Sequence, residues 1–184
     1  MGIRRKAKSA VGHPIRGMHA GDETLAMNDP RLACDRTLSV TSTAFAANGE
    51  LPARVTADGE NVSPSIEWSG EPGGTREVVV LCEDPDAPMP KPFVHWLVHG
   101  IEPSEHRIDE GTAIAQQGKN STRDVGYTGA APPRGHGTHH YHFEVFALDR
   151  SLGVKADCTR DELVEAMAGH VLARGELVGT YARN

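Results

Sequence analysis

Two carboxylates at the end of an apolar run are the first side chains whose types and spacing suit chemistry. The run Val78–Cys82 is rich in β-branched residues and is followed by Asp84-Pro85-Asp86-Ala87-Pro88. The two prolines stiffen the turn, and clefts commonly form where a sheet ends. Asp and Pro are also ordinary turn residues, so a plain turn is the alternative interpretation.

Histidines form the second group. His95 shares a predicted strand face with Phe93 and Leu97, where a hydrogen-bonded core histidine is the alternative to a ligand-binding one. Further along the chain, a stiff loop, Ala131 to Gly137, leads into a histidine-rich strand. A period of two places His139 and Tyr141 on one face of that strand, and His140 and His142 on the other.

These groups describe one coherent site if Asp84, Asp86, His95, His139 and Tyr141 converge at one end of a sheet. Imidazoles and a phenol donate hydrogen bonds to an anion, while nearby carboxylates fix the histidine tautomers and raise the histidine pKa values. Backbone N–H groups of the Gly/Pro loop add donors. The pattern predicts a small pocket for phosphate, a phosphorylated headgroup or a carboxylate.

Other chemistries find less support. The same-face histidines are two residues apart with no adjacent carboxylate, and neither HExxH nor GxSxG occurs, so we expect no metal, no cofactor and no catalytic residue. Gly111 to Gly118-Lys119 has the wrong spacing for a P-loop. Cys82 lies in an apolar strand, which favours a core role. A non-enzymatic binding module is therefore the leading hypothesis, and a small-molecule hydrolase that uses an Asp–His pair is the alternative.

The elements that must position these residues are mostly short strands. Apolar or alternating stretches separated by Gly, Pro and Asn-Gly turns predict a β-sandwich or barrel rather than a βαβ fold. They are Leu38–Thr41, Ile66–Trp68, Val78–Cys82, Phe93–Ile101 and His140–Leu148, with Leu177–Tyr181 as a last strand or packed tail. One helix is indicated by the capping box Thr159–Glu162, followed by Leu163, Met167, His170 and Val171 at helical spacing and by Gly175 as C-cap.

Composition limits the remaining possibilities. The chain has 184 residues, 38% hydrophobic and 24% charged, which suits one globular domain. Residues 1–36 carry seven basic and four acidic side chains, and the rest of the chain is acidic, which argues against nucleic-acid binding. Three unclustered cysteines, no secretory signal and no membrane-spanning run together predict a reduced, cytoplasmic protein. We divide the chain into an arm, 1–36, with a possible short helix over Ile15–Met27, and a domain, 37–184.

Several stretches together resemble the phosphatidylethanolamine-binding protein family, especially its bacterial branch of Raf-kinase-inhibitor-like proteins. They are Asn61–Pro64 with Trp68, Asp84–Pro88, His95–Val98, Pro132–Tyr141, Phe146–Asp149 and Gly179–Arg183. The similarity covers about Thr37 to Arg183. It implies a mainly β fold, an antiparallel two-sheet β-sandwich with a helix near the C-terminus.

The resemblance also implies an anion pocket at one end of the sandwich. Its residues would be Asp84, Asp86, His95, His139 and Tyr141, lined by Ala87, Pro88, Ala131 and Pro132. The family usually has Gly or Gly-Pro before the paired prolines, whereas Ala130-Ala131 stand here, and a methyl group at Ala131 would narrow the pocket. Family members bind phosphate-containing headgroups and nucleotides, and some inhibit kinases or proteases by contact. Two kinds of partner are therefore expected. One is a kinase or hydrolase that the protein regulates by contact, and the other is a second copy of the chain, in a homodimer formed through Ile15, Met18 and Leu25 of the arm.

Overall fold

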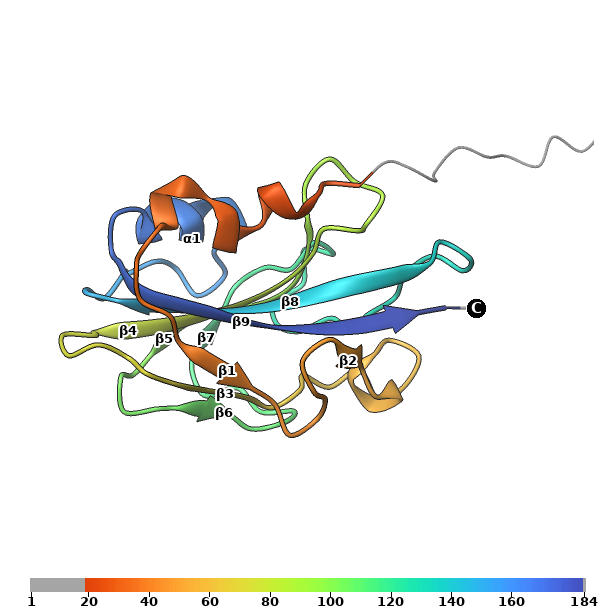
Figure 1. Cartoon of the computed structure of the whole chain (residues 1–184), viewed down its shortest axis with the longest axis horizontal. Helices are drawn as coiled ribbons and strands as arrows, with labels where there is room; N and C mark the ends of the chain where they lie inside the picture. Colours follow the sequence, from red (N-terminus) through yellow and green to blue (C-terminus); the bar gives the residue numbers. More distant parts are fainter. Residues whose placement is uncertain (1–18, 184) are drawn as a thin grey trace, which may run out of the picture.

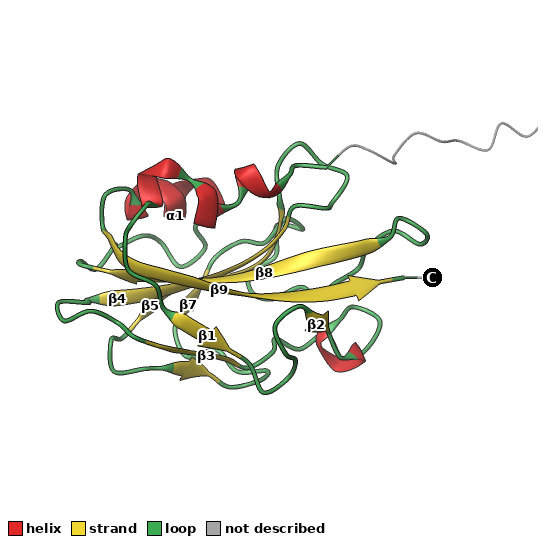
Figure 2. Cartoon of the chain, in the orientation of Figure 1, coloured by secondary structure: helices red, strands yellow, loops and turns green. Residues whose placement is uncertain are grey.

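Two β-sheets pack face to face, and a helical layer covers the outer face of the larger sheet (Figures 1 and 2). The computed structural model describes residues 19–183. The smaller sheet has the strand order β1 (Ser39–Thr41), β3 (Ile66–Ser69) and β6 (Arg107–Ile108). The larger has the order β2 (Gly49–Glu50), β9 (Val171–Ala182), β8 (Thr138–Leu148), β4 (Glu77–Asp84), β5 (Phe93–Ile101) and β7 (Gln116–Gln117). The predicted mainly β, two-sheet fold is confirmed. All strand pairs are antiparallel except β2 with β9, which is parallel.

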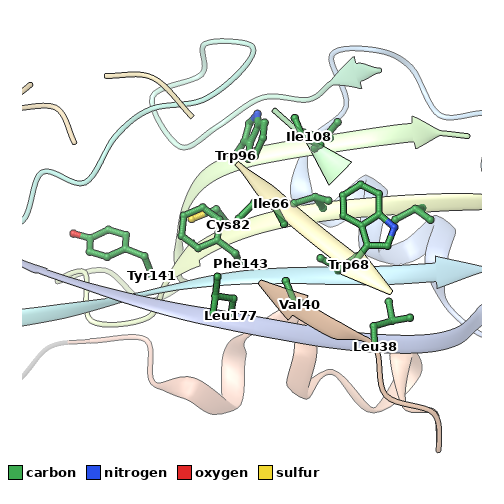
Figure 3. Close-up of a cluster of buried hydrophobic side chains, with 14 of the residues drawn as sticks. Leu38, Val40, Ile66, Trp68, Cys82, Trp96, Ile108, Tyr141, Phe143 and Leu177 are labelled. Carbon is green, nitrogen blue, oxygen red and sulfur yellow. The ribbon is translucent and has the colours of Figure 1, made fainter. Parts of the chain in front are cut away.

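The core has two parts because the larger sheet is covered on both faces. Figure 3 shows the part between the sheets, where Trp96 and Phe143 of the larger sheet face Ile66 and Trp68 of the smaller one. The second part lies on the opposite face under the helix and includes Phe146. A strand covered on both sides needs no polar alternation, which is why all eight residues of β4 are buried.

Helix α1 (Arg160–Met167) begins at the predicted capping box. The Thr159 hydroxyl accepts a hydrogen bond from the Glu162 backbone N–H, and the Glu162 carboxylate accepts one from the Thr159 backbone N–H at 2.8 Å. The helix is shorter than predicted: it ends at Met167, and His170 lies in the connection that follows. Gly169, with a φ of 76°, turns the chain into β9.

Gly175 is not a helix cap but lies inside β9, and the same holds for Gly179. A Cβ atom at Gly175 would lie 2.3 Å from the Leu38 carbonyl oxygen, and one at Gly179 would lie 2.5 Å from a Leu51 methyl group. These glycines therefore let the segment that holds β1 and β2 cross closely over β9. The last strand is accordingly longer than the predicted Leu177–Tyr181.

The described part of the arm forms three short 3₁₀ turns, at Asp22–Thr24, Ala26–Asn28 and Pro30–Leu32, instead of the helix expected over Ile15–Met27. Leu25 has extended backbone, and two sheet carboxylates accept the N–H groups that follow it: Ala26 N–H donates to Glu83 and Met27 N–H to Glu144. Long-range acceptors thus replace the hydrogen bonds of an α-helix. Residues 15–18 of the predicted helix lie outside the described residues.

Within residues 19–183, no helix combines the length and the apolar character needed to cross a bilayer.

Candidate ligand-binding site

A cavity of about 270 Å³ lies at the end of the larger sheet where β4 ends and β8 begins. The start of β8 is on the right in Figure 1. Three segments meet there: the turn after β4, the loops between β7 and β8, and the first residues of β8. The lining residues are Asp84, Ala87, Pro88, Met89, Phe93, His95, Thr122, Thr128, Gly129, Ala131, Pro132, Pro133 and His139. Seven of the nine predicted site residues are therefore brought together.

Asp84 and His139 form the buried centre of the site. The Oδ2 atom of Asp84 lies 2.8 Å from Nδ1 of His139, and both side chains are almost fully buried. The other oxygen, Oδ1, accepts hydrogen bonds from the backbone N–H groups of Asp86 and Ala87. The carboxylate therefore organises its own turn and also fixes the imidazole, which holds its proton on Nδ1.

His136 extends this pair into a chain of three groups. Its Nδ1 atom lies 2.8 Å from Nε2 of His139. Because Nδ1 of His139 donates to Asp84, Nε2 of a neutral His139 carries the lone pair and accepts from His136. Sequence analysis did not select His136, whose only signal was its place three residues before His139 in the loop.

His95 is held by a backbone carbonyl. Its Nδ1 atom lies 2.6 Å from the Thr128 oxygen. A carbonyl only accepts, so Nδ1 carries the proton and Nε2 is an acceptor while the ring is neutral. Burial lowers the pKa of His95, and this effect outweighs the Thr128 carbonyl and the Asp84 carboxylate, which act to raise it. The predicted rise of the histidine pKa is therefore wrong for His95.

A β-bulge places His95 in the site. Cys82 pairs with Trp96 and Glu83 pairs with Val94, so His95 is an extra residue in β5. His95 then contacts the ring of Tyr141 on the side between the sheets, while Val94 and Leu97 pack in the core under the helix. The predicted shared face of Phe93, His95, Leu97 and His99 is wrong at this point, because strict alternation does not hold across a bulge.

Two predicted residues, Asp86 and Tyr141, are close to the cavity without lining it. Asp86 binds the backbone N–H and lies 2.7 Å from Nδ1 of His140, and so ties the turn to β8 from outside. The ring of Tyr141 packs edge-on against the ring of His95, with 5.1 Å between the ring centroids. Figure 3 shows Tyr141 at one end of the core cluster. Its buried hydroxyl has no partner among the described residues, and burial raises its pKa.

Four apolar residues that the sequence analysis selected lie in the cavity lining: Ala87, Pro88, Ala131 and Pro132. Ala131 is exposed at the rim, and its methyl group leaves the cavity open. Sequence reasoning missed Met89, Phe93, Thr122, Thr128, Gly129 and Pro133 as lining residues. Most of them lie in irregular connections, where no periodic pattern indicates which way a side chain points.

Within residues 19–183 the site holds neither a metal-binding arrangement nor a reactive thiol. Among the described residues, no three His, Cys, Asp or Glu side chains are placed to hold a metal ion. Cys82 is fully buried, and burial raises its pKa, which keeps it a thiol. The three cysteines are free, as the sequence indicates.

Comparison with known proteins decides the family. The family model described as phosphatidylethanolamine-binding protein matches residues 41–182. The chain belongs to the phosphatidylethanolamine-binding protein family. A UPF0098 protein of Pyrococcus horikoshii is 40% identical over 151 residues, covering 77% of this chain and 75% of that one. A UPF0098 protein of Methanothermobacter thermautotrophicus is 37% identical over 153 residues, covering 79% and 99%.

Solved structures of the same family share the fold. A homologue from Chlamydia trachomatis, named a putative phosphatidylethanolamine-binding protein homologue, is 32% identical with a TM-score of 0.76 over 82% of this chain and all of that one. YbcL of E. coli, described as a member of the mammalian family, is 30% identical with a TM-score of 0.76, covering 80% and 99%. Residues 1–40 and 183–184 lie outside the match of the family model.

Proposed function

We propose that this protein is a non-enzymatic binding module that holds a small phosphorylated or carboxylated ligand in the cavity beside His95 and His139. The observation that carries the proposal is the pair of oriented imidazoles. Each Nδ1 is committed, one to the Thr128 carbonyl and one to the Asp84 carboxylate, while both rings line the same cavity. The ligand contacts Nε2 of His95 directly and contacts Nε2 of His139 by displacing His136. Membership in a family named for a phospholipid supports a phosphorylated ligand.

The tautomers define how such a ligand binds. In the neutral state Nε2 of His95 accepts, so it pairs with the hydroxyl of a phosphate monoanion or with the ammonium group of phosphoethanolamine. A fully ionised phosphate needs a donor there, so its binding takes up a proton. Apolar walls formed by Phe93, Pro132 and Pro133 then shield these hydrogen bonds from water.

Direct titration tests the proposal. Inorganic phosphate, phosphoethanolamine and acetate are added to the full chain while the histidine side-chain NMR signals are recorded. We expect saturable shifts at His95 and His139 and none at His106, which is exposed and whose Nδ1 atom lies 2.8 Å from the Glu71 carboxylate, away from the cavity. Unchanged signals of His95 and His139 at millimolar concentrations of all three anions contradict the proposal.

Two neighbouring carboxylates give a matched pair of variants. Asp84→Asn removes the charge that orients His139, whereas Asp86→Asn makes the same change at a group that binds His140 outside the cavity. A hydrogen bond to a charged group contributes about 1.5–3 kcal/mol, so we expect Asp84→Asn to weaken phosphate binding by about tenfold or more and Asp86→Asn to leave it nearly unchanged. Calorimetric titration measures both, and equal losses would remove Asp84 from its assigned role.

The chain of hydrogen bonds from Asp84 through His139 to His136 supports a second candidate function, a hydrolase in which the Asp–His pair moves a proton. Turnover of simple phosphomonoesters and carboxylic esters that disappears in Asp84→Asn would favour it over the binding module. Absence of turnover across these substrates rules it out.

A further inference from the structure

A second cavity of about 270 Å³ adjoins the first. Met89 lines both, and consecutive residues of one loop divide between them: Thr122 lines the first cavity, while Ser121 and Arg123 line the second. Adjacent Cα atoms are only 3.8 Å apart, so the two cavities are neighbours. The second is lined by Met89, Lys91, Pro92, Val94, Lys119, Asn120, Ser121, Arg123, Thr159, Arg160 and Asp161 and is called the basic cleft below.

The basic cleft holds four cationic side chains and one carboxylate, Asp161. Lys91 pairs with Asp161, and Lys119 with Asp157, but these side chains are largely exposed, and exposed ion pairs contribute little. Arg160 is committed to the buried Glu83 at 2.8 Å. Arg123 forms no side-chain hydrogen bond or ion pair within residues 19–183.

Arg123 also has an unfavourable backbone conformation. Its φ is 74°, and the other two described non-glycine residues with positive φ, Asn48 and Asn61, belong to the type that tolerates this region. The loop enforces the conformation. Asn120 N–H donates to the Asp124 carbonyl, Arg123 N–H donates to the Asn120 carbonyl, and the Asn120 side chain accepts from Thr122. Arginine thus stands at a place that suits asparagine or glycine, and strained residues of this kind cluster at ligand-binding and active sites.

Over residues 19–183, the first cavity has no cationic side chain of its own for an anionic ligand. No Lys or Arg lines it in the described part of the chain, and its carboxylate, Asp84, is turned toward His139. A ligand with one anionic group therefore gains no fixed positive charge there. A ligand that continues past Met89 reaches Arg123, whose planar fork of donors matches a phosphate or carboxylate.

We propose that the basic cleft is a second anion subsite, in which Arg123 binds a second phosphate or carboxylate of the ligand held at His139. The inference rests on the proposed function and narrows its ligand to molecules with two anionic groups separated by a short spacer.

Probes that differ only in the second phosphate test it. Propyl phosphate and propane-1,3-diyl bisphosphate are titrated calorimetrically into the full chain at low salt. We expect the bisphosphate to bind about tenfold more tightly or better, as for one charge-assisted hydrogen-bond pair. Arg123→Gln should abolish this preference and leave propyl phosphate unaffected, while Arg123→Lys should keep part of it.

Arg76→Gln serves as the matched control. Arg76 is exposed and precedes β4, at the end of that strand away from Asp84. Arg123→Gly separates binding from folding, because glycine adopts the positive φ without strain: we expect an equal or higher melting temperature together with loss of the preference.

The outcomes distinguish the second subsite at Arg123 from the ligand site at His95 and His139. Suppose that propyl phosphate binds and that His139→Gln abolishes this binding. The second subsite is then wrong, and the first stands, if the bisphosphate binds no more tightly than propyl phosphate. The same conclusion follows if the bisphosphate keeps its higher affinity in Arg123→Gln. If neither probe binds, both are wrong.

Discussion

At the scale of single residues, the site is defined by what each histidine is already bonded to. Asp84 and the Thr128 carbonyl each occupy one Nδ1 atom and so decide the role of the opposite nitrogen. The residue types and their order pointed to Asp84, His95 and His139. They did not separate these from Asp86 and Tyr141, because a step of one or two positions along the chain decides which side of a turn or sheet a group faces.

The buried His95 predicts a pH dependence of stability. Its pKa in the folded chain lies below the ordinary value of about 6.5, because burial disfavours the charged ring. Between these two pKa values the unfolded chain binds more protons than the folded chain, so the free energy of unfolding rises with pH. The stabilising contribution of the neutral His95 is fully present above a pH of about 6.5 and is lost as the pH falls through the pKa of the folded chain. We expect a contribution of up to about 1.4 kcal/mol per pH unit.

Denaturant unfolding of the wild type and His95→Gln from pH 5 to 8 measures this contribution. The variant should show a smaller decrease on acidification, whereas His106→Gln, which alters an exposed ring, should follow the wild type. Parallel curves for all three proteins would show that His95 is not held neutral by the fold.

At the scale of elements, the sequence predicts best where a strand is long and buried. The predicted Phe93–Ile101 coincides with β5, since the apolar run and flanking turn residues determine both ends. The bulge at His95 left no trace in the sequence, because it exists only in the pairing of β5 with β4. The two-residue strands β2, β6 and β7 are too short for any periodicity to appear.

Helix α1 shows the opposite case, in which a local signal is sufficient. The capping box of Thr159 and Glu162 satisfies backbone donors of the first turn, so we expect Thr159→Ala to lower the free energy of unfolding by about 1 kcal/mol. Thr112→Ala, which removes an exposed hydroxyl from a turn, is the control and should cost less. Urea unfolding of the two variants decides the matter, and equal values would mean that the cap contributes nothing.

At the scale of the whole molecule, the fold is a larger sheet covered on one face by a small sheet and on the other by helical segments. The family resemblance predicted the two sheets. It did not predict how residues 19–36 dock, because their 3₁₀ turns depend on Glu83 and Glu144, which are distant in sequence. Leu25, expected at a dimer contact, is buried within its own chain. Homodimerisation and regulation of a kinase or hydrolase partner stay predictions.

Two deletions separate the roles of the arm. Removing residues 1–18 keeps the docked segment 19–36 and tests whether a dimer depends on the residues before it. Removing residues 1–32 exposes the core around Leu32 and takes away the donors to Glu83 and Glu144. Each fully buried leucine contributes about 1.5–3 kcal/mol, so the longer deletion should destabilise the chain by about 3 kcal/mol or more. Light scattering of the same proteins tests the predicted homodimer. If the full chain has the mass of one copy, the homodimer is contradicted. If the full chain is a dimer and the shorter deletion converts it to a folded monomer, the dimer contact is assigned to residues 1–18.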